Sequence, residues 1–417
     1  MSRMNDVPMR IAHHEAEGLL DDLGEALRLS AKVIAPNDSL GCVLAEDVVA
    51  PIDLPPFDNS AMDGFAYRHA DLGDAGGRLP LVGEQFAGRD QGAALGQGEC
   101  LRITTGAPLP QGADSVAIKE DCRVVDSEDH QTWVELPAGL KAGAHRRPAG
   151  EDAKAGDVVM SAGQVIDASR LGVLAALGLT SVTVASEPRV AVFSSGDELR
   201  PAGEPLAPGE IHDSNGPMLS ALLAEEGIAI ASLGSLPDDP AAIRSRLAEA
   251  AKDHDLIITC GGVSAGEKDH ITATLAELGE IVFWKVRIKP GMPLLCGRIG
   301  DCAVLGLPGN PVSVLVTWLV FGRHLLDAMQ GRSEPRPRLR ARLSEALHKR
   351  HSRMEFQRGH LLVDEQGTLW IAPDPATPSN RLCAAAAANA LFVVAEREQQ
   401  LAKGAVVEVV PLRGFGV

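Results

Sequence analysis

The sequence predicts a multidomain protein with a doubly wound α/β domain, a β-rich domain inserted towards the N-terminus, and a small C-terminal β-barrel or β-sandwich. The α/β prediction rests on apolar runs that alternate with helical patterns, as buried parallel strands alternate with crossover helices. Arg189–Phe193 (RVAVF) and Asp255–Thr259 (DLIIT) are two such runs. The β predictions rest on short strand patterns that glycine and proline interrupt before residue 160 and again after residue 331.

Four segments are expected from these changes of pattern. A chain of 417 residues suggests about two to four domains. We expect residues 1–50 and 148–187 to form a mixed linker domain and residues 51–147 the inserted β-rich domain. Residues 188–330 are expected to form the α/β domain, and residues 331–417 the C-terminal β domain.

Helical spacing of apolar residues predicts three further elements. Residues 10–30 carry a leucine stripe, Asp167–Leu177 has a cap and a glycine stop, and Val312–Met329 is a long apolar helix. Pro217 is expected at the first position of a helix that follows a turn. In the last segment, the turn Asp364–Gly367 between two apolar runs predicts a β-hairpin.

Composition excludes several classes of function. The formal net charge is −17 and aromatic residues make up only 3%, so binding of nucleic acid or of an acidic membrane is not expected. The sequence contains no run of 18 apolar residues, so no membrane span is predicted. The first residues lack the apolar core of a signal peptide, which favours a cytoplasmic protein.

A glycine-rich loop follows the predicted strand Asp255–Thr259. Glycines let a backbone approach a ligand closely, and successive amides can point at an anion. A phosphate-binding loop is therefore favoured over a purely structural turn, although it lacks the Gly-Lys-Ser/Thr of a P-loop. Its candidate ligand contacts are Gly261, Gly262, Ser264 and Gly266.

Carboxylates follow two of the predicted strands. Asp269 stands at the start of a predicted helix, and Asp197–Glu198 follows the strand Arg189–Phe193. Mg2+ binds one or two carboxylates together with substrate phosphates and water. Asp269 and Glu198 are thus candidate metal ligands. The alternatives are a helix N-cap for Asp269 and a turn for the Asp197–Glu198 pair.

Three cations alternate in Phe283–Pro290 (FWKVRIKP). Side chains two apart share one face of a strand, so Lys285, Arg287 and Lys289 could form one cationic row. In so acidic a chain such a row is a natural anion site, although a solvated strand face has the same pattern.

The segment Gly306–Ser313 (GLPGNPVS) joins a predicted strand to the long helix. Its prolines fix the path of the backbone, and the amides at the helix start could bind an oxyanion. Pro308, Gly309 and Pro311 are therefore candidate binding residues, although plain helix entries have the same composition. Asp63, Thr105 and Asp152, in polar turns of the front half, have no assignable role from their residue types alone.

Seven motifs occur in one order along almost the whole chain. They are DNSAMDGFA, RITTGAPLP with GAD, GED, FSSGDEL, GGVSAGEKD, FWKVRIKPG and GLPGNPVS. In this order they resemble the MoeA-type molybdopterin molybdenumtransferases, a family that also includes the gephyrin E domain. The α/β domain would then be of the molybdopterin-binding type.

The resemblance implies four subdomains, an elongated homodimer and a reaction. Adenylylated molybdopterin and molybdate would give molybdenum cofactor and AMP, with Mg2+. A molybdopterin adenylyltransferase and cofactor-receiving apo-enzymes become candidate partners.

The resemblance also implies site residues at matching positions. Asp63 and Thr105 would come from the partner subunit of the dimer. Asp152 matches the acid of the GED motif, and Glu198 and Asp269 match functional acids of the α/β domain. Further implied positions are Lys285, Lys289, Pro308, Pro311 and either Asp238 or Asp239.

Departures from the family pattern concern the anion site. Met292 stands where a lysine is common, which removes a cation, and Lys268 could partly compensate. Cys260 replaces a usual serine before the glycine loop. From the variable region that follows Pro378, only Ser379 is carried over.

Two other functions fit parts of the sequence. A molybdopterin adenylyltransferase is an isolated α/β domain with the same kind of phosphate-binding glycine loop. The long N-terminal half and the C-terminal β domain of this chain argue against that function. A non-catalytic molybdopterin-binding scaffold would not need Asp63, Glu198 and Asp269, and their presence favours an enzyme.

Overall fold

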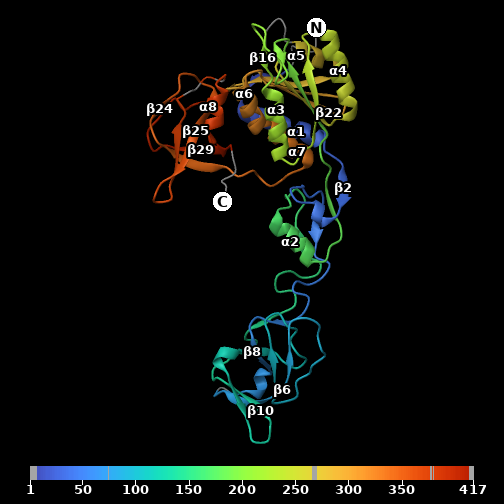
Figure 1. Cartoon of the computed structure of the whole chain (residues 1–417), viewed down its shortest axis with the longest axis vertical. Coiled ribbons are helices and arrows are strands. Elements are labelled where there is room, and N and C mark those ends of the chain that lie inside the picture. The colour runs from blue at the N-terminus through green and yellow to red at the C-terminus, as the bar shows by residue number, and fades with distance from the viewer. Residues whose placement is uncertain (1–6, 74, 265–269, 376–377, 379, 413–417) are drawn as a thin grey trace. The chain divides into compact units, whose positions relative to one another are not determined.

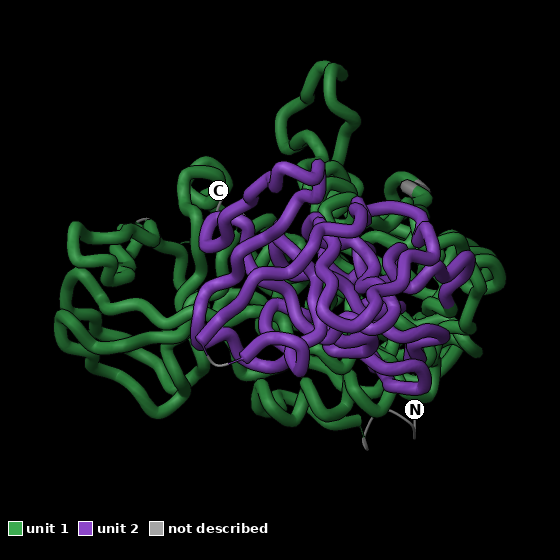
Figure 2. The backbone as a smooth tube through the Cα atoms, turned by 90° about the horizontal axis from the view of Figure 1, so that it is seen from below, with its two compact units in different colours: residues 1–46, 162–167, 183–417 green, residues 47–161, 168–182 purple. Residues whose placement is uncertain are grey.

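The computed structural model describes residues 7–73, 75–264, 270–375, 378 and 380–412. The chain divides into two compact units, which are distinguished by colour in Figure 2. The first comprises residues 1–46, 162–167 and 183–417, and the second comprises residues 47–161 and 168–182.

The first unit contains a seven-stranded sheet in the order β1-β19-β21-β22-β18-β14-β17. Its strands are β1 (Met9–Ile11), β14 (Val190–Ser195), β17 (Ile230–Leu236), β18 (Leu256–Cys260), β19 (Glu280–Val286), β21 (Leu295–Ile299) and β22 (Cys302–Leu307). Neighbouring strands are parallel except around β21, which is antiparallel to β19 and β22. The α/β prediction is confirmed, with one antiparallel strand inserted.

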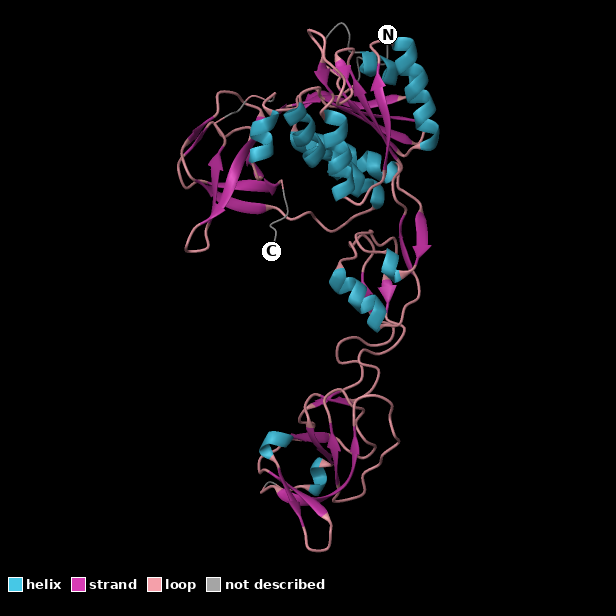
Figure 3. Ribbon diagram, viewed as in Figure 1, coloured by secondary structure: helices cyan, strands magenta, loops and turns pink. Residues whose placement is uncertain are grey.

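Helices cover both faces of this sheet (Figures 1 and 3). Val190 and Val192 of β14 pack in one core with α1 (His13–Ala26), α3 (Asn215–Glu225), α6 (Pro311–Thr317) and α7 (Arg323–Gln330). Ala191 and Phe193 point the other way, into a core with α4 (Pro240–Asp253) and α5 (His270–Leu278). Alternate residues of a strand face opposite sides, so an uninterrupted apolar run is what a strand covered on both faces requires.

The long apolar helix differs from its prediction in the middle. A π-helical segment, Trp318–Gly322, separates α6 from α7. A Cβ at Gly322 would lie 2.3 Å from the Trp318 ring, so the indole packs where a side chain would otherwise stand. Pro311–Gln330 is long and apolar enough to cross a membrane, but 67% of its most apolar window is buried inside the protein. Its composition is therefore explained by its place in the core.

The start of α3 also differs from the prediction. The helix begins at Asn215, so Pro217 is its third residue and not its first. Asp213 Oδ1 accepts hydrogen bonds from the amides of Asn215 and Gly216, at 3.0 and 3.1 Å. A side chain before the helix satisfies these amides and decides where the helix starts.

The C-terminal strands close into a barrel, which confirms one of the two predicted forms. Five strands form the ring β25-β26-β23-β29-β27, and β27 pairs back with β25. They are β23 (Leu339–Leu343), β25 (Met354–Val363), β26 (Leu369–Pro373), β27 (Ala390–Val394) and β29 (Val406–Pro411). The predicted hairpin is β25–β26, and the short β20 (Ile288–Lys289) adds to β25 from outside the ring. The remaining C-terminal elements are β24 (Leu347–His348), β28 (Gln400–Leu401) and α8 (Leu382–Ala387).

The second unit is β-rich, as predicted. Its main sheet has the order β8-β5-β7-β6-β10-β9. These strands are β5 (Gly64–Tyr67), β6 (Gly77–Gln85), β7 (Cys100–Ile103), β8 (Ser115–Ile118), β9 (Arg123–Asp126) and β10 (Thr132–Leu136). The pairs β3–β12 (Val48–Val49, Val158–Met160) and β4–β11 (Asn59–Ser60, Arg146–Arg147) and helix α2 (Ala168–Ala176) complete it.

Short elements also lie in the first unit outside its sheet and barrel. They are the pairs β2–β13 (Ala31–Ile34, Val182–Ala185), of which only Val182 belongs to the second unit, and β15–β16 (Leu199–Arg200, Ile211–His212). The four-segment division of the chain stays a prediction.

Helix α1 provides a matched test of its packing against α7. A Cβ at Gly24 would lie 2.3 Å from Ala328 Cβ, whereas nothing lies within 4 Å of a Cβ at Gly18. We expect Gly24→Ala to lower the free energy of unfolding by about 1–3 kcal/mol through overpacking. Gly18→Ala should raise it by about 0.5–1 kcal/mol through helix propensity. Urea denaturation followed by circular dichroism measures both, and equal effects would contradict this account of the contact.

Candidate functional site

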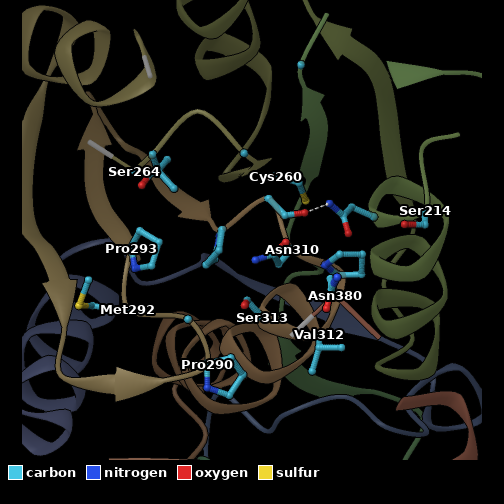
Figure 4. A pocket seen from close by; sticks show the side chains of 18 of the residues that line it. Ser214, Cys260, Ser264, Pro290, Met292, Pro293, Asn310, Val312, Ser313 and Asn380 are labelled. Atoms are coloured by element: carbon cyan, nitrogen blue, oxygen red, sulfur yellow. Dashed lines mark hydrogen bonds between the residues drawn. The ribbon is translucent and has the colours of Figure 1, made fainter. Parts of the chain in front are cut away.

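The carboxyl ends of β14, β18 and β22 meet at one edge of the sheet. The loops that leave them are residues 195–198, 260–264 and 308–310, and all three line a cavity of about 1210 Å³. Figure 4 shows Cys260, Asn310, Ser313 and Asn380 gathered in this cavity, with Pro290, Met292 and Pro293 bordering it. Ligands of open α/β sheets bind at such strand ends.

The glycine loop is shaped by its own packing. Gly261 and Gly262 have φ values of +93° and +68°. A Cβ at Gly261 would lie 2.8 Å from the Ser195 carbonyl oxygen, and one at Gly262 would lie 2.8 Å from Ile271 Cδ1. Structure therefore requires both glycines. Together with the exposed Ser264 they also line the cavity, so the structural role and a binding role coexist. Gly266 lies outside the described residues.

Acidic side chains line the sheet side of the cavity. Glu198, Asp213 and Asp238 all come from segments that follow β14 or β17. Asp213 is already bonded, because besides capping α3 it accepts the Ser194 hydroxyl hydrogen bond at 2.6 Å. Glu198 is exposed and Asp238 half-buried, so these two are placed to meet a ligand.

The structure separates the roles of the two adjacent aspartates. Asp239 is the N-cap of α4, and its Oδ2 accepts the Ala242 amide hydrogen bond at 2.9 Å. Asp238 lines the cavity, and its amide donates to Asp197 Oδ1 at 3.1 Å. Asp238 is thus the member of the pair that lines the cavity.

The side chains at this edge offer hard oxygen donors. Asp269, the second candidate ligand, lies outside the described residues. Within the part of the chain that is described, no three His, Cys, Asp or Glu side chains form a metal cluster. Mg2+ held mainly by phosphates and water needs only one or two carboxylates, and Glu198 with Asp238 offers that chemistry.

The predicted row of three cations does not form. Lys285 has a φ of +69°, which breaks the strand alternation, and it is buried with Nζ 4.0 Å from the Trp284 ring centroid. Arg287 pairs with Glu396 at 3.4 Å. Lys289 alone of the three lines the cavity. The backbone conformation at Lys285, which residue types do not reveal, sends the side chains in different directions.

Two arginines from the barrel supply cations that the sequence reasoning missed. Arg353 and Arg358 flank the start of β25 and line the cavity, and Arg358 Nε lies 3.7 Å from Asp374 Oδ2. Arg353 Nη1 lies 3.9 Å from Met292 Sδ. A cation therefore stands beside the position where the family often has a lysine. The sequence pattern that could have predicted them is the run Arg353–Arg358 (RMEFQR), in which two cations surround one acid in a strongly acidic chain.

Lys289 is paired with a buried carboxylate. Its Nζ lies 2.8 Å from Oε1 of Glu355, whose side chain is 5% exposed. Residues 289 and 355 are opposite each other in the β20–β25 pairing. Burial alone would raise the pKa of Glu355, but the Lys289 contact holds that pKa below its ordinary value. The carboxylate therefore stays ionised and neutralises the cavity lysine.

The segment Gly306–Ser313 lines the cavity where α6 begins. Pro308, Gly309, Pro311 and the buried Ser313 all contribute to the lining. Asn215 Nδ2 donates to the Gly309 carbonyl at 2.8 Å and fixes this turn against α3. Cys260 is buried nearby, and burial raises the pKa of its thiol, so it remains protonated at neutral pH.

Three further candidates lie in the second unit. Asp63 Oδ1 accepts hydrogen bonds from the Thr105 amide at 2.8 Å and the Thr105 hydroxyl at 2.9 Å. Lys119 Nζ lies 3.3 Å from its other oxygen. The Thr105 and Lys119 contacts lower the pKa of Asp63, so the carboxylate is ionised. Asp152 is exposed, and its amide donates to the Leu54 carbonyl at 2.9 Å.

Three family profiles match successive parts of the chain. Residues 12–178 match "MoeA N-terminal region (domain I and II)", residues 191–328 match "Probable molybdopterin binding domain", and residues 340–412 match "MoeA C-terminal region (domain IV)". The match thus extends over nearly the whole sequence.

Curated relatives and a solved structure agree with these profiles. The molybdopterin molybdenumtransferase of Haemophilus influenzae is 37% identical, over 88% of this chain and 91% of its own. Molybdopterin molybdenumtransferase 2 of Mycobacterium tuberculosis is 37% identical, over 93% and 96%. The crystal structure of the molybdopterin biosynthesis MoeA protein from Pyrococcus horikoshii superposes with a TM-score of 0.81 at 27% identity, over 96% and 99%. The chain therefore belongs to the MoeA family of molybdopterin molybdenumtransferases, which are transferases of molybdenum cofactor biosynthesis.

Proposed function

We propose that this protein inserts molybdate into adenylylated molybdopterin and releases AMP, giving molybdenum cofactor. The observation that carries the proposal is the division of charge in the cavity. Glu198 and Asp238 line its sheet side. On its barrel side three cations, Lys289, Arg353 and Arg358, stand against two acids, Glu355 and Asp374, which pair with Lys289 and Arg358. A substrate with a phosphate-bound metal at one end and an oxyanion at the other matches this division.

The sheet side would hold the adenylate phosphates. The glycine loop and the start of α6 present backbone at the strand ends, where anions bind to amides. Glu198 and Asp238, with Asp269, are the residues that would hold Mg2+. Bound there, the metal would polarise the phosphoryl oxygen and neutralise developing charge.

The barrel side would hold molybdate. Lys289 and Arg353 are positive, and the buried Ser313 hydroxyl lies in the same lining. Arginine and lysine with hydroxyl donors suit a tetrahedral oxyanion, since charged donors make the stronger hydrogen bonds. Molybdate would then stand ready for capture by the dithiolate sulfurs of the pterin when AMP leaves.

We further propose that the protein works as a cytoplasmic homodimer. In the second unit Thr105 is exposed and the Asp63 side chain is 44% exposed. A residue that serves the cavity of a partner subunit needs such accessibility. A molybdopterin adenylyltransferase that supplies the substrate and apo-enzymes that receive the cofactor are the expected partners.

The decisive measurement is AMP release from adenylylated molybdopterin by the purified protein with Mg2+. We expect release that depends on molybdate, and a product that activates a cofactor-free molybdoenzyme. Tight pterin binding without AMP release would instead identify a scaffold. Consumption of ATP with unadenylylated molybdopterin would identify an adenylyltransferase.

Glu198 provides a test of the acidic side of the cavity. Glu198→Gln should keep the fold and slow AMP release by about a hundredfold or more, because metal-assisted charge stabilisation is worth several kcal/mol. Glu204→Gln is the matched control, since Glu204 is exposed in the following turn and does not line the cavity. Equal turnover of both variants, measured as AMP per minute, would remove Glu198 from the mechanism.

The adjacent aspartates should separate stability from activity. Asp239→Ala removes the α4 cap and should cost about 1 kcal/mol of unfolding free energy with little change in AMP release. Asp238→Ala should do the reverse, slowing AMP release about tenfold with little change in stability. Thermal unfolding and the AMP assay on both variants check this, and exchanged phenotypes would reverse the assignment.

A further inference from the structure

The Lys289–Glu355 pair sets a condition on anion binding. Glu355 Oε1 holds the lysine ammonium at 2.8 Å, and the carboxylate is nearly inaccessible to solvent. If Lys289 turns to bind an oxyanion, the buried carboxylate of Glu355 loses its partner. Leaving one charge of a buried pair uncompensated is strongly unfavourable. Anion binding therefore needs a second partner for Glu355.

His351 stands at the other oxygen of the same carboxylate. Its Nε2 lies 3.2 Å from Glu355 Oε2, with the side chain 22% exposed. Neither buried ring nitrogen has an aligned hydrogen-bond partner among the described residues. The ring is close enough to become a partner. Its nitrogens are buried, but the side chain as a whole is 22% exposed and therefore lies close to solvent.

The turn that carries His351 is held by a buried lysine. Lys349 is 2% exposed, and its ammonium donates to the carbonyls of Arg353, Ala395 and Glu396. The contacts to Arg353 and Glu396 measure 2.9 and 3.3 Å. These hydrogen bonds of Lys349 fix the turn between β24 and β25. His351 therefore stays beside Glu355 when the contact between Lys289 and Glu355 changes.

We infer that oxyanion binding at Lys289 is coupled to protonation of His351, which becomes the partner of Glu355 when the lysine turns to the ligand. The imidazole accepts one proton from solvent, and its Nε2–H then donates to Glu355 Oε2. No covalent bond changes, and the added proton compensates the charge that the ligand withdraws. The inference rests on the proposed oxyanion side of the cavity.

Electrostatics give the direction of the pH dependence. In the free protein, burial lowers the pKa of His351. Lys289 and Arg353 lower it further and Glu355 opposes them, so the ring is neutral near neutral pH. The ligand's negative charge offsets the two cations and releases Glu355, which raises that pKa. Protons are taken up wherever the pH lies between the free and bound values, so binding must weaken as pH rises.

Isothermal titration of the full-length protein with sodium molybdate tests the inference. Titrations in two buffers of different ionisation enthalpy give the protons exchanged per ligand. We expect uptake of up to about one proton, and an affinity that falls about three- to tenfold between about pH 6.5 and 8.5. His351→Gln should lose the uptake and the pH dependence. His348→Gln is the matched control, because His348 is exposed on β24, where it pairs with Gln400 of β28.

A second variant tests the inference independently, in case His351→Gln disturbs the fold. Glu355→Gln keeps the shape of the side chain but frees Lys289, so it should bind molybdate at least as tightly as the natural protein at high pH, without proton uptake. Molybdate binding by the natural protein without uptake, or uptake that survives in His351→Gln, would overturn the inference. An absence of molybdate binding would overturn it as well. AMP release decides the proposed function separately, because it does not depend on proton stoichiometry.

Discussion

The parallel pairing of β14, β18 and β22 is the constraint on which the cavity depends. Phe193 pairs with Thr259, and Thr259 with Gly306, so three strands end at the same level of the sheet. Each strand is buried on both faces, which fixes this register because a slip would expose apolar side chains. The loops that follow must then crowd together, and this crowding, through Ser195 and Ile271, dictates glycine at positions 261 and 262.

The second face of the cavity is set by a much shorter pairing. Strand β20 pairs with β25 at only two positions, Ile288 with Met354 and Lys289 with Glu355. This contact brings the barrel's charged residues to the strand ends of the sheet. It also places a cavity lysine on a buried carboxylate, so the charge presented to an anion depends on where that lysine points. The sheet and the barrel thereby both contribute charged side chains to one cavity.

Particular residues show which parts of the structure could be predicted from the sequence. The apolar runs around Val190–Ser195 and Leu256–Cys260 predicted buried strands because short runs that are apolar on both faces are typical of strands covered on both sides. The cationic row failed because the left-handed backbone at Lys285 breaks the alternation on which the prediction relied. Arg353 and Arg358 were missed because they come from a barrel strand about 90 residues beyond the glycine loop, a distance over which pattern carries no contact information.

The sequence by itself determined the element types, the β-rich and α/β regions, the glycine loop and the motif order that resembles the MoeA family. These follow from local periodicity, turn chemistry and residue spacing. Tertiary structure alone decided that Asp239 caps a helix while Asp238 faces the cavity, and that Lys289 is neutralised by Glu355. The physical reason is that a side chain's partner depends on backbone direction and strand register, which only the folded packing fixes.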